Sequence, residues 1–314
     1  MPEAFSGQQH TITVSSDGVA AYLTQIIASR LLWLQESIRE EIWELASTRL
    51  AERSGRSAAP SMTREFIIGD NLTISLHEPS LTGDMLGLKT WSSSLMLARR
   101  LGVGPLRDVV PVTKVGDKLR VLELGSGTGL VGITVACMWR AYATLTDLPE
   151  IVPNLTKNAQ RNAFQVKERD GELSVKALDW ADESAVLKRK DSDLDEDPYP
   201  VIVAADPLYS PEHPKLLADT VGRWLERSCD ARFVVEVPLR DGYERERTDM
   251  RRRLQDIGLE IEEEGEDTGF DDWEGSDGQR QEVRYSWSVW KGSTRWCPSE
   301  VTTSAASEQR EDES

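Results

Sequence analysis

The 314-residue sequence predicts an α/β fold whose core is a seven-stranded, mostly parallel β-sheet with an antiparallel hairpin at its end. From Leu119 onward, short apolar runs alternate with helical segments, a pattern typical of parallel strands covered by helices. The runs GLEIEEE and VRYSWSVW then follow each other with no helical pattern between them. Because successive strands pair as an antiparallel hairpin, we place these two at one edge of the sheet.

The chain divides into three predicted regions: an N-terminal helical extension over 1–60, the main domain over 61–295, and a disordered tail over 296–314. Apolar residues recur at helical spacing from Val19 to Leu50, which predicts one long amphipathic helix. We interpret Trp33 and Trp43 on this helix as core residues rather than as an interaction stripe.

The main domain is predicted to begin with a β-hairpin, because two β-rich runs flank Gly69, Asp70 and Asn71. Thr82 or Asp84 then caps a short helix in this interpretation. The predicted apolar face of that helix consists of Leu88, Trp91, Leu95, Met96 and Leu97.

The sheet strands are predicted at 120–124, 143–147, 173–178, 201–205 and 232–237, and the helices between them at 130–139, 151–162, 214–227 and 243–257. Two acidic segments, 188–200 and 262–278, are predicted to be mobile loops. Either loop could contact a basic substrate, but a solvated run of charge is the commoner explanation.

The composition excludes several classes of function. A formal net charge of −17 opposes binding to a phosphate backbone and favours a partner with a basic or lysine-bearing surface. No leader pattern or long apolar run predicts secretion or a membrane span, so we expect a cytoplasmic protein. Three dispersed cysteines and three dispersed histidines argue against a metal site and against a disulfide framework.

The strongest motif is VLELGSGTGLVGI, in which a strand containing Glu123 opens through Gly125, Ser126, Gly127 and Gly129 into a helix. Glycines allow the backbone to turn tightly and to approach a ligand closely. A dinucleotide fingerprint requires glycine or alanine at the position of Leu130. The early third glycine and the preceding acid instead resemble motif I of class I methyltransferases.

That resemblance implies a Rossmann-like domain and S-adenosylmethionine as the cofactor. In such enzymes the acid at the position of Glu123 faces the methionine ammonium, acts through bound water, or braces the loop. Asp147 ends the second strand, where a carboxylate can accept hydrogen bonds from ribose hydroxyls, although it could instead cap the next helix. Asp179 and Trp180 follow the third strand, where they could bind adenine by hydrogen bonding and packing.

The fourth strand leads into AADPLYS, which places Asp206 and Tyr209 at the same carboxyl edge as the glycine loop. The ordered set EPSLTGDMLGLKTW, ELGSGTGLVGI, LTDLPEIVPNLTKN, LDW and DPLYSPEHP resembles the seven-β-strand protein-lysine methyltransferases that carry an Asp-x-x-Tyr motif. Within that family the sequence is similar to fungal members that methylate translation elongation factors. The resemblance covers roughly 72–290.

The resemblance also implies roles for individual residues. Trp91 matches a tryptophan beside the cofactor, and Ala205 matches a small residue that lines the cofactor site. Gly125, Ser126 and Gly127 match the loop around the methionine end. The resemblance further assigns Asp147 to the ribose, Trp180 to the adenine, and Asp206 and Tyr209 to the two ends of the Asp-x-x-Tyr motif.

Methyl transfer to lysine requires alignment of nucleophile, methyl and sulfur, together with a neutral amine. We hypothesise that Asp206 orients the amine and that Tyr209 lines an aromatic channel for the lysine stem. Asp-Pro-Leu-Tyr also resembles the Asp/Asn-Pro-Pro-Tyr motif of enzymes that methylate adenine or glutamine, although Leu208 replaces its second proline. A methyltransferase acting on glutamine, a nucleic-acid base or a small molecule, and a non-catalytic adaptor, remain alternatives. We expect a monomer.

Overall fold

The computed structural model describes residues 19–51, 61–80, 86–104, 106, 109, 118–182, 197–240, 242–274 and 280–296. The chain divides into two compact units, Met1–Pro60 and Ser61–Ser314. The predicted tail beyond residue 296 and most of the predicted acidic loop at 188–200 lie outside the described residues.

The first unit contains two helices, α1 (Val19–Ala28) and α2 (Glu36–Ala51), so the prediction of one long helix was wrong. The chain turns between them at Leu31, whose φ of 45° is left-handed and whose side chain is buried. Trp33 in this turn is 77% exposed, which contradicts its interpretation as core. Trp43 donates a hydrogen bond to the carbonyl of Ser29, 3.1 Å away, across the turn. Apolar residues keep helical spacing through this turn, so the sequence pattern gave no sign of it.

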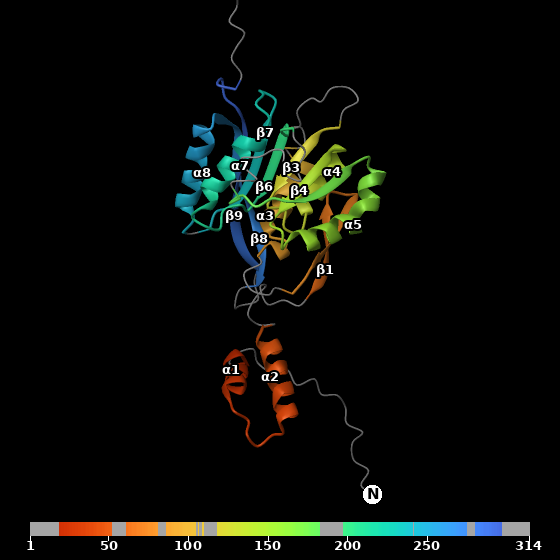
Figure 1. Ribbon diagram of the computed structural model, residues 1–314, viewed down its shortest axis with the longest axis vertical. Helices are drawn as coiled ribbons and strands as arrows, with labels where there is room; N and C mark the ends of the chain where they lie inside the picture. The colour runs from red at the N-terminus through yellow and green to blue at the C-terminus, as the bar shows by residue number, and fades with distance from the viewer. Residues whose placement is uncertain are drawn as a thin grey trace, which may run out of the picture. The chain divides into compact units, whose positions relative to one another are not determined.

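The second unit contains the sheet and its covering helices (Figure 1). Its strands are β1 (Met62–Ile68), β2 (Leu72–Glu78), β3 (Arg120–Leu124), β4 (Tyr142–Asp147), β5 (Glu172–Ala177), β6 (Val201–Ala205), β7 (Arg232–Pro238), β8 (Leu259–Glu274) and β9 (Arg280–Gly292). Its described helices are the short η2 (Leu86–Leu88), α3 (Ser92–Gly102), α4 (Leu130–Trp139), α5 (Val152–Glu168), α7 (His213–Trp224) and α8 (Glu244–Asp256).

The large sheet has seven strands in the order β5-β4-β3-β6-β7-β9-β8. The first five strands in that order are parallel, while β9 pairs antiparallel with both β7 and β8. The predicted α/β class, the seven strands and the antiparallel terminal hairpin are therefore confirmed. The strand order reverses between β3 and β6, and ligands of open α/β sheets bind beside the carboxyl ends of strands at such a point.

Alternating side chains of the parallel strands build two hydrophobic cores, one on each face of the sheet. Val121, Val203 and Val234 face a core with Leu97 of α3 and Ile133 of α4. Their sequence neighbours Leu122, Ala204 and Val235 face a core that contains residues of α7 and α8. Strands buried on both faces read as continuous apolar runs, which is why the sequence predicted them well.

The predicted hairpin is present as β1 and β2, which form a separate antiparallel pair. Two buried asparagines of α5 hold its second strand: the side chains of Asn158 and Asn162 exchange hydrogen bonds with the backbone of His77 and Ser75. The hairpin is thus tied to α5, the helix that follows strand β4.

Two further predictions require correction. The segment predicted as an acidic loop at 262–278 is mostly strand, because β8 extends to Glu274 and its acids meet bases on neighbouring elements. Glu262 pairs with Arg232 at 2.5 Å, and Glu264 pairs with Arg251 at 2.5 Å. Tyr199, placed in the other acidic loop, is fully buried.

Helix α3 begins at Ser92 and has Trp91 as its N-cap residue. The predicted caps, Thr82 and Asp84, lie outside the described residues. Among the described residues, no helix is long and apolar enough to cross a membrane. In the same part of the chain, no cluster of three or more His, Cys, Asp or Glu could hold a metal ion. Cys137 is a buried free thiol, whereas Cys229 is disulfide-bonded, a pairing that cysteine spacing did not indicate.

Candidate active site

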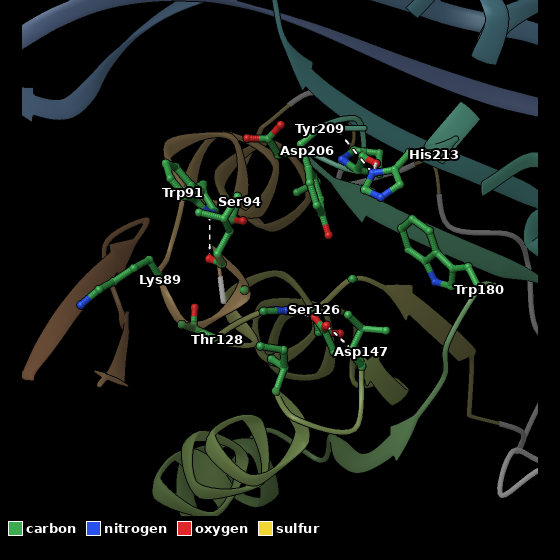
Figure 2. Close-up of a pocket in the computed structure, with 18 of the residues that line it drawn as sticks. Lys89, Trp91, Ser94, Ser126, Thr128, Asp147, Trp180, Asp206, Tyr209 and His213 are labelled. Atoms are coloured by element: carbon green, nitrogen blue, oxygen red, sulfur yellow. Dashed lines mark hydrogen bonds between the residues drawn. The ribbon is translucent and has the colours of Figure 1, made fainter. Parts of the chain in front are cut away.

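A cavity of about 600 Å³ lies at the carboxyl ends of the parallel strands. It brings together all of the predicted site residues except Glu123 and Gly129 (Figure 2). The predicted residues that line it are Trp91, Gly125, Ser126, Gly127, Asp147, Asp179, Trp180, Ala205, Asp206 and Tyr209. Residues separated by more than a hundred positions in the sequence therefore share one site.

The glycine loop turns sharply between β3 and α4. Gly127 has a φ of 55°, and a Cβ at this position would lie 3.1 Å from the carbonyl oxygen of Gly87. The loop is tied to the end of β4, because Ser126 donates its backbone N–H to the carbonyl of Thr146 at 2.9 Å and accepts the N–H of Thr146 on its hydroxyl at 3.0 Å. The loop thus presents its backbone to the cavity in a fixed shape.

Gly129 supports this loop from behind the cavity wall. Its φ is 93°, and a Cβ there would lie 2.8 Å from the Leu155 side chain of α5. Close packing of the loop on α5 therefore explains the glycine at position 129, which does not face the cavity.

Glu123 also lies behind the loop, with a side chain 2% exposed. Its carboxyl accepts the backbone N–H of Gly132 at 3.0 Å, at the start of α4. Burial raises the pKa of Glu123 to about 8, against the opposing effect of a hydrogen bond from Ser126. Of the roles considered for this acid, the geometry matches bracing of the loop.

Asp147 lies at the end of β4 and accepts hydrogen bonds from the backbone N–H groups of Gly127 at 2.7 Å and Leu148 at 2.8 Å. Burial raises its pKa, and these hydrogen bonds oppose that shift. The N-cap of α5 is Ile151, so Asp147 does not cap this helix. The carboxylate instead joins the glycine loop to the end of β4 at the wall of the cavity.

Asp179 and Trp180 line the cavity beyond the end of β5. The Trp180 ring packs beside the glycine loop, since a Cβ on Gly125 would lie 3.5 Å from it. Asp179 accepts the backbone N–H of Ala181 at 2.9 Å, which fixes the turn after the strand. This end of the cavity combines an aromatic wall with a carboxylate.

At the other end, Asp206 follows β6 with a left-handed φ of 53°. Its backbone N–H donates to the carbonyl of Glu236 on β7 at 2.8 Å, and its carboxylate pairs with Arg240 at 2.9 Å. Tyr209 is 49% exposed and meets the His213 ring edge to face at 4.1 Å between centroids. Burial, followed by the charges of Asp147 and Asp206, raises the pKa of Tyr209. Figure 2 shows the Tyr209 ring directed into the cavity.

The sequence analysis missed several lining residues, notably Lys89, Glu150, His213, Arg240 and Tyr243. A positional signal existed for Arg240, which follows the end of β7 by two residues and so lies at the same carboxyl edge. His213 begins α7, four residues beyond Tyr209. The pattern gave no comparable signal for Lys89.

The fold and the site together define the class of the protein. A glycine loop at the switch point of a doubly wound sheet, with an acid at the end of the next strand, is typical of α/β enzymes that bind a nucleoside-containing cofactor. The motif Asp-x-x-Tyr after β6 adds a polar and an aromatic side chain beside that cofactor region.

Comparisons with known proteins identify the family. Residues 69–250 match the model of the lysine methyltransferase family, and the chain belongs to that family. The chain is 37% identical over 279 residues to the protein-lysine N-methyltransferase EFM2 of Saccharomyces cerevisiae, a match covering 83% of this chain and 64% of that protein. It is 32% identical to the protein-lysine N-methyltransferase rrg1 of Schizosaccharomyces pombe, covering 86% of this chain and 84% of that protein. The chain thus spans slightly less than two thirds of EFM2 and most of rrg1.

Proposed function

We propose that this protein is an S-adenosylmethionine-dependent protein-lysine N-methyltransferase and that its substrate is a translation elongation factor. The observation that carries the proposal is the single cavity that joins the glycine loop and Asp147 to Asp206 and Tyr209. Membership of the lysine methyltransferase family supports the reaction. The elongation factor rests on the resemblance to fungal enzymes that act on such factors.

The residues present fit the cofactor. The cavity volume of about 600 Å³ is in the range of small-molecule sites, and the glycine loop lines it through Gly125, Ser126 and Gly127. In this proposal Gly125, Ser126 and Gly127 hold the methionine end, Asp147 binds the ribose, and Asp179 and Trp180 bind the adenine. Trp91 and Ala205 line the transfer end. When bound, S-adenosylmethionine would supply an electrophilic sulfonium methyl group, whose transfer to a neutral amine would form the N–C bond, break the S–C bond and leave a neutral thioether.

The transfer end must align a neutral lysine amine. With an ordinary pKa of about 10.4, deprotonating lysine at neutral pH costs about 4 to 5 kcal/mol. The largely buried carboxylate of Asp206 can accept an N–H of the amine and so direct its lone pair toward the methyl group. Tyr209 is half exposed at this end and can pack along the apolar stem of the lysine. The product ammonium then releases a proton to solvent.

The remaining features of the proposal concern the partner and the setting. A net charge of −17 suits a substrate with a basic surface and opposes nucleic acid. We further expect a monomeric, cytoplasmic enzyme without a metal ion.

The proposal is tested by incubating the purified protein with radiolabelled S-adenosylmethionine and a fungal lysate. We expect one labelled protein of the size of an elongation factor, with methylated lysine found by mass spectrometry, and no label with Asp206→Ala. Label on glutamine, nucleic acid or a small molecule would overturn the proposed substrate class. Tight cofactor binding by calorimetry without any label would point to a non-catalytic adaptor.

A further inference from the structure

The guanidinium of Arg240 lies between the Asp206 carboxylate and the Trp91 ring. It forms a fork-like pair with the carboxylate, with Nη2 at 2.9 Å from Oδ2 and Nη1 at 3.5 Å from Oδ1. Its central carbon is 5.7 Å from the centroid of the Trp91 ring. All three residues line the cavity at its transfer end.

Hydrogen bonds hold the backbone at both partners of this ion pair. Asp206 is anchored to β7 by its backbone hydrogen bond to Glu236, and its side chain is only 8% exposed. The backbone at Arg240 is held on two sides: Leu239 donates to the carbonyl of Arg284 at 2.7 Å, and Arg247 donates to the carbonyl of Arg240 at 3.1 Å. This ion pair has an anchored and mostly buried carboxylate, so it differs from a surface ion pair, which contributes little to stability.

This arrangement matters because of what a bare carboxylate does to an amine. An opposite charge close to lysine favours its ammonium form, which has no lone pair with which to attack the methyl group. Lysine therefore needs a group that orients it without holding its proton. A carboxylate whose charge is already offset by a guanidinium meets that requirement.

We propose that Arg240 is a positioning residue that offsets the charge of Asp206, so that the carboxylate orients the substrate lysine without stabilising its ammonium form. The inference rests on the proposed lysine methylation. Arg240 approaches both carboxylate oxygens, with Nη2 at 2.9 Å from Oδ2 and Nη1 at 3.5 Å from Oδ1, so its charge offsets that of the whole carboxylate.

The other charged and titratable groups of the cavity do not take over this function. Asp147, Glu150 and Asp179 are acids, so they favour a protonated amine as Asp206 does. The side chain of Lys89 is directed away from Asp206 in Figure 2.

The remaining groups carry little charge at neutral pH. Burial lowers the pKa of His213, which keeps its ring neutral. Tyr209 has a raised pKa and also stays neutral. Arg240 is thus the cation in the described part of the cavity that lies against Asp206.

The test measures the initial rate of label transfer to lysine for the wild type, Arg240→Gln and Arg240→Lys. Each protein is assayed between pH 6 and 10 with a fungal lysate diluted so that the protein substrate is below saturation. We expect Arg240→Gln to move the half-maximal pH upward by about one unit, so that activity at neutral pH falls about tenfold and recovers at high pH. Arg240→Lys should keep the position of the profile with a lower maximum. Arg252→Gln removes an exposed arginine of α8 and serves as the matched control.

A loss of equal size at every pH in Arg240→Gln would reduce Arg240 to a structural role and overturn the inference. A higher rate at every pH would mean that Arg240 blocks the lysine site until the substrate displaces it, which would also contradict the inference. The melting temperature and the cofactor affinity of each variant are measured as well, the latter by calorimetry. If both are unchanged, a shift of the pH–rate profile is a property of the transfer step. Wild-type protein that labels no lysine would overturn the proposed function itself, before any variant is compared.

Discussion

The two ends of the cavity are built in different ways. At the proposed cofactor end, the glycine loop after β3 is joined to the end of β4 by hydrogen bonds from backbone N–H groups to the side chains of Asp147 and Ser126, across 20 residues of sequence. At the proposed transfer end the contacts are between side chains: Asp206 pairs with Arg240, which is 34 positions away, and Tyr209 meets the ring of His213. In the proposed function, backbone shape would hold the cofactor, and side-chain electrostatics would control the reacting amine.

The largest effect is expected at the transfer end. Asp206→Ala should lower methyl transfer by about 10²-fold or more, because an amine that is not oriented rarely meets the methyl group in line. Cofactor affinity, measured by calorimetry, should be largely kept. If the variant fails to bind S-adenosylmethionine, then Asp206 belongs to the cofactor end and the comparison between the two ends fails.

The next largest effect is expected at the cofactor end, where a substitution should lower cofactor affinity more than the rate of transfer. Asp147→Asn removes a charged acceptor worth about 1.5 to 3 kcal/mol, so cofactor affinity should fall about 10- to 100-fold. The rate at saturating cofactor should change much less. Titration calorimetry and a rate series over cofactor concentration separate these quantities, and a lowered saturating rate with normal affinity would argue against a ribose contact.

A smaller effect is expected at Tyr209, which sharpens the assignment of the lysine channel. Tyr209→Ala should weaken capture of the protein substrate about tenfold, because it removes a ring that packs on the lysine stem. Tyr209→Phe keeps that ring and its edge contact with His213, and should retain most activity. Equal losses in the two variants, measured at low substrate concentration, would assign the function to the hydroxyl instead.

The last prediction concerns stability rather than activity. In the folded protein Glu123 has a pKa of about 8, above its ordinary value of 4.5, so the fold favours the protonated acid. The wild type should therefore lose stability as pH rises from about 5 to 8, because ionising the buried carboxyl opposes folding.

Glu123→Gln removes this titration while preserving the shape of the side chain. The difference in melting temperature between the variant and the wild type should shift in favour of the variant across that pH range. A difference that stays constant with pH would show that Glu123 is ionised throughout. Glu236, also buried with a pKa raised to about 7, is present in both proteins and cancels from the comparison.

The sequence predicted the sheet and the position of the glycine loop well because their signals are local. Buried parallel strands are continuous apolar runs, and a glycine loop with an acid before it lies within one short motif. The same local signals placed Asp206 and Tyr209 at the correct edge, since they directly follow a strand.

Longer-range features were harder to predict. The ion pair of Asp206 with Arg240 joins residues 34 positions apart, and no single motif contains both. The acidic segment of β8 resembles a solvated loop until arginines of other elements pair with it, as Arg232 and Arg251 do. The turn at Leu31 has neither proline nor glycine, so helical spacing concealed it.

The central claim is that the two ends of one cavity meet where the methyl group is transferred. A crystal structure with S-adenosylhomocysteine bound tests it most directly. We expect the ribose hydroxyls on Asp147, the adenine beside Trp180, and the sulfur directed toward Asp206 and Tyr209. A ligand bound with its nucleoside at Asp206, or outside this cavity, would contradict the account.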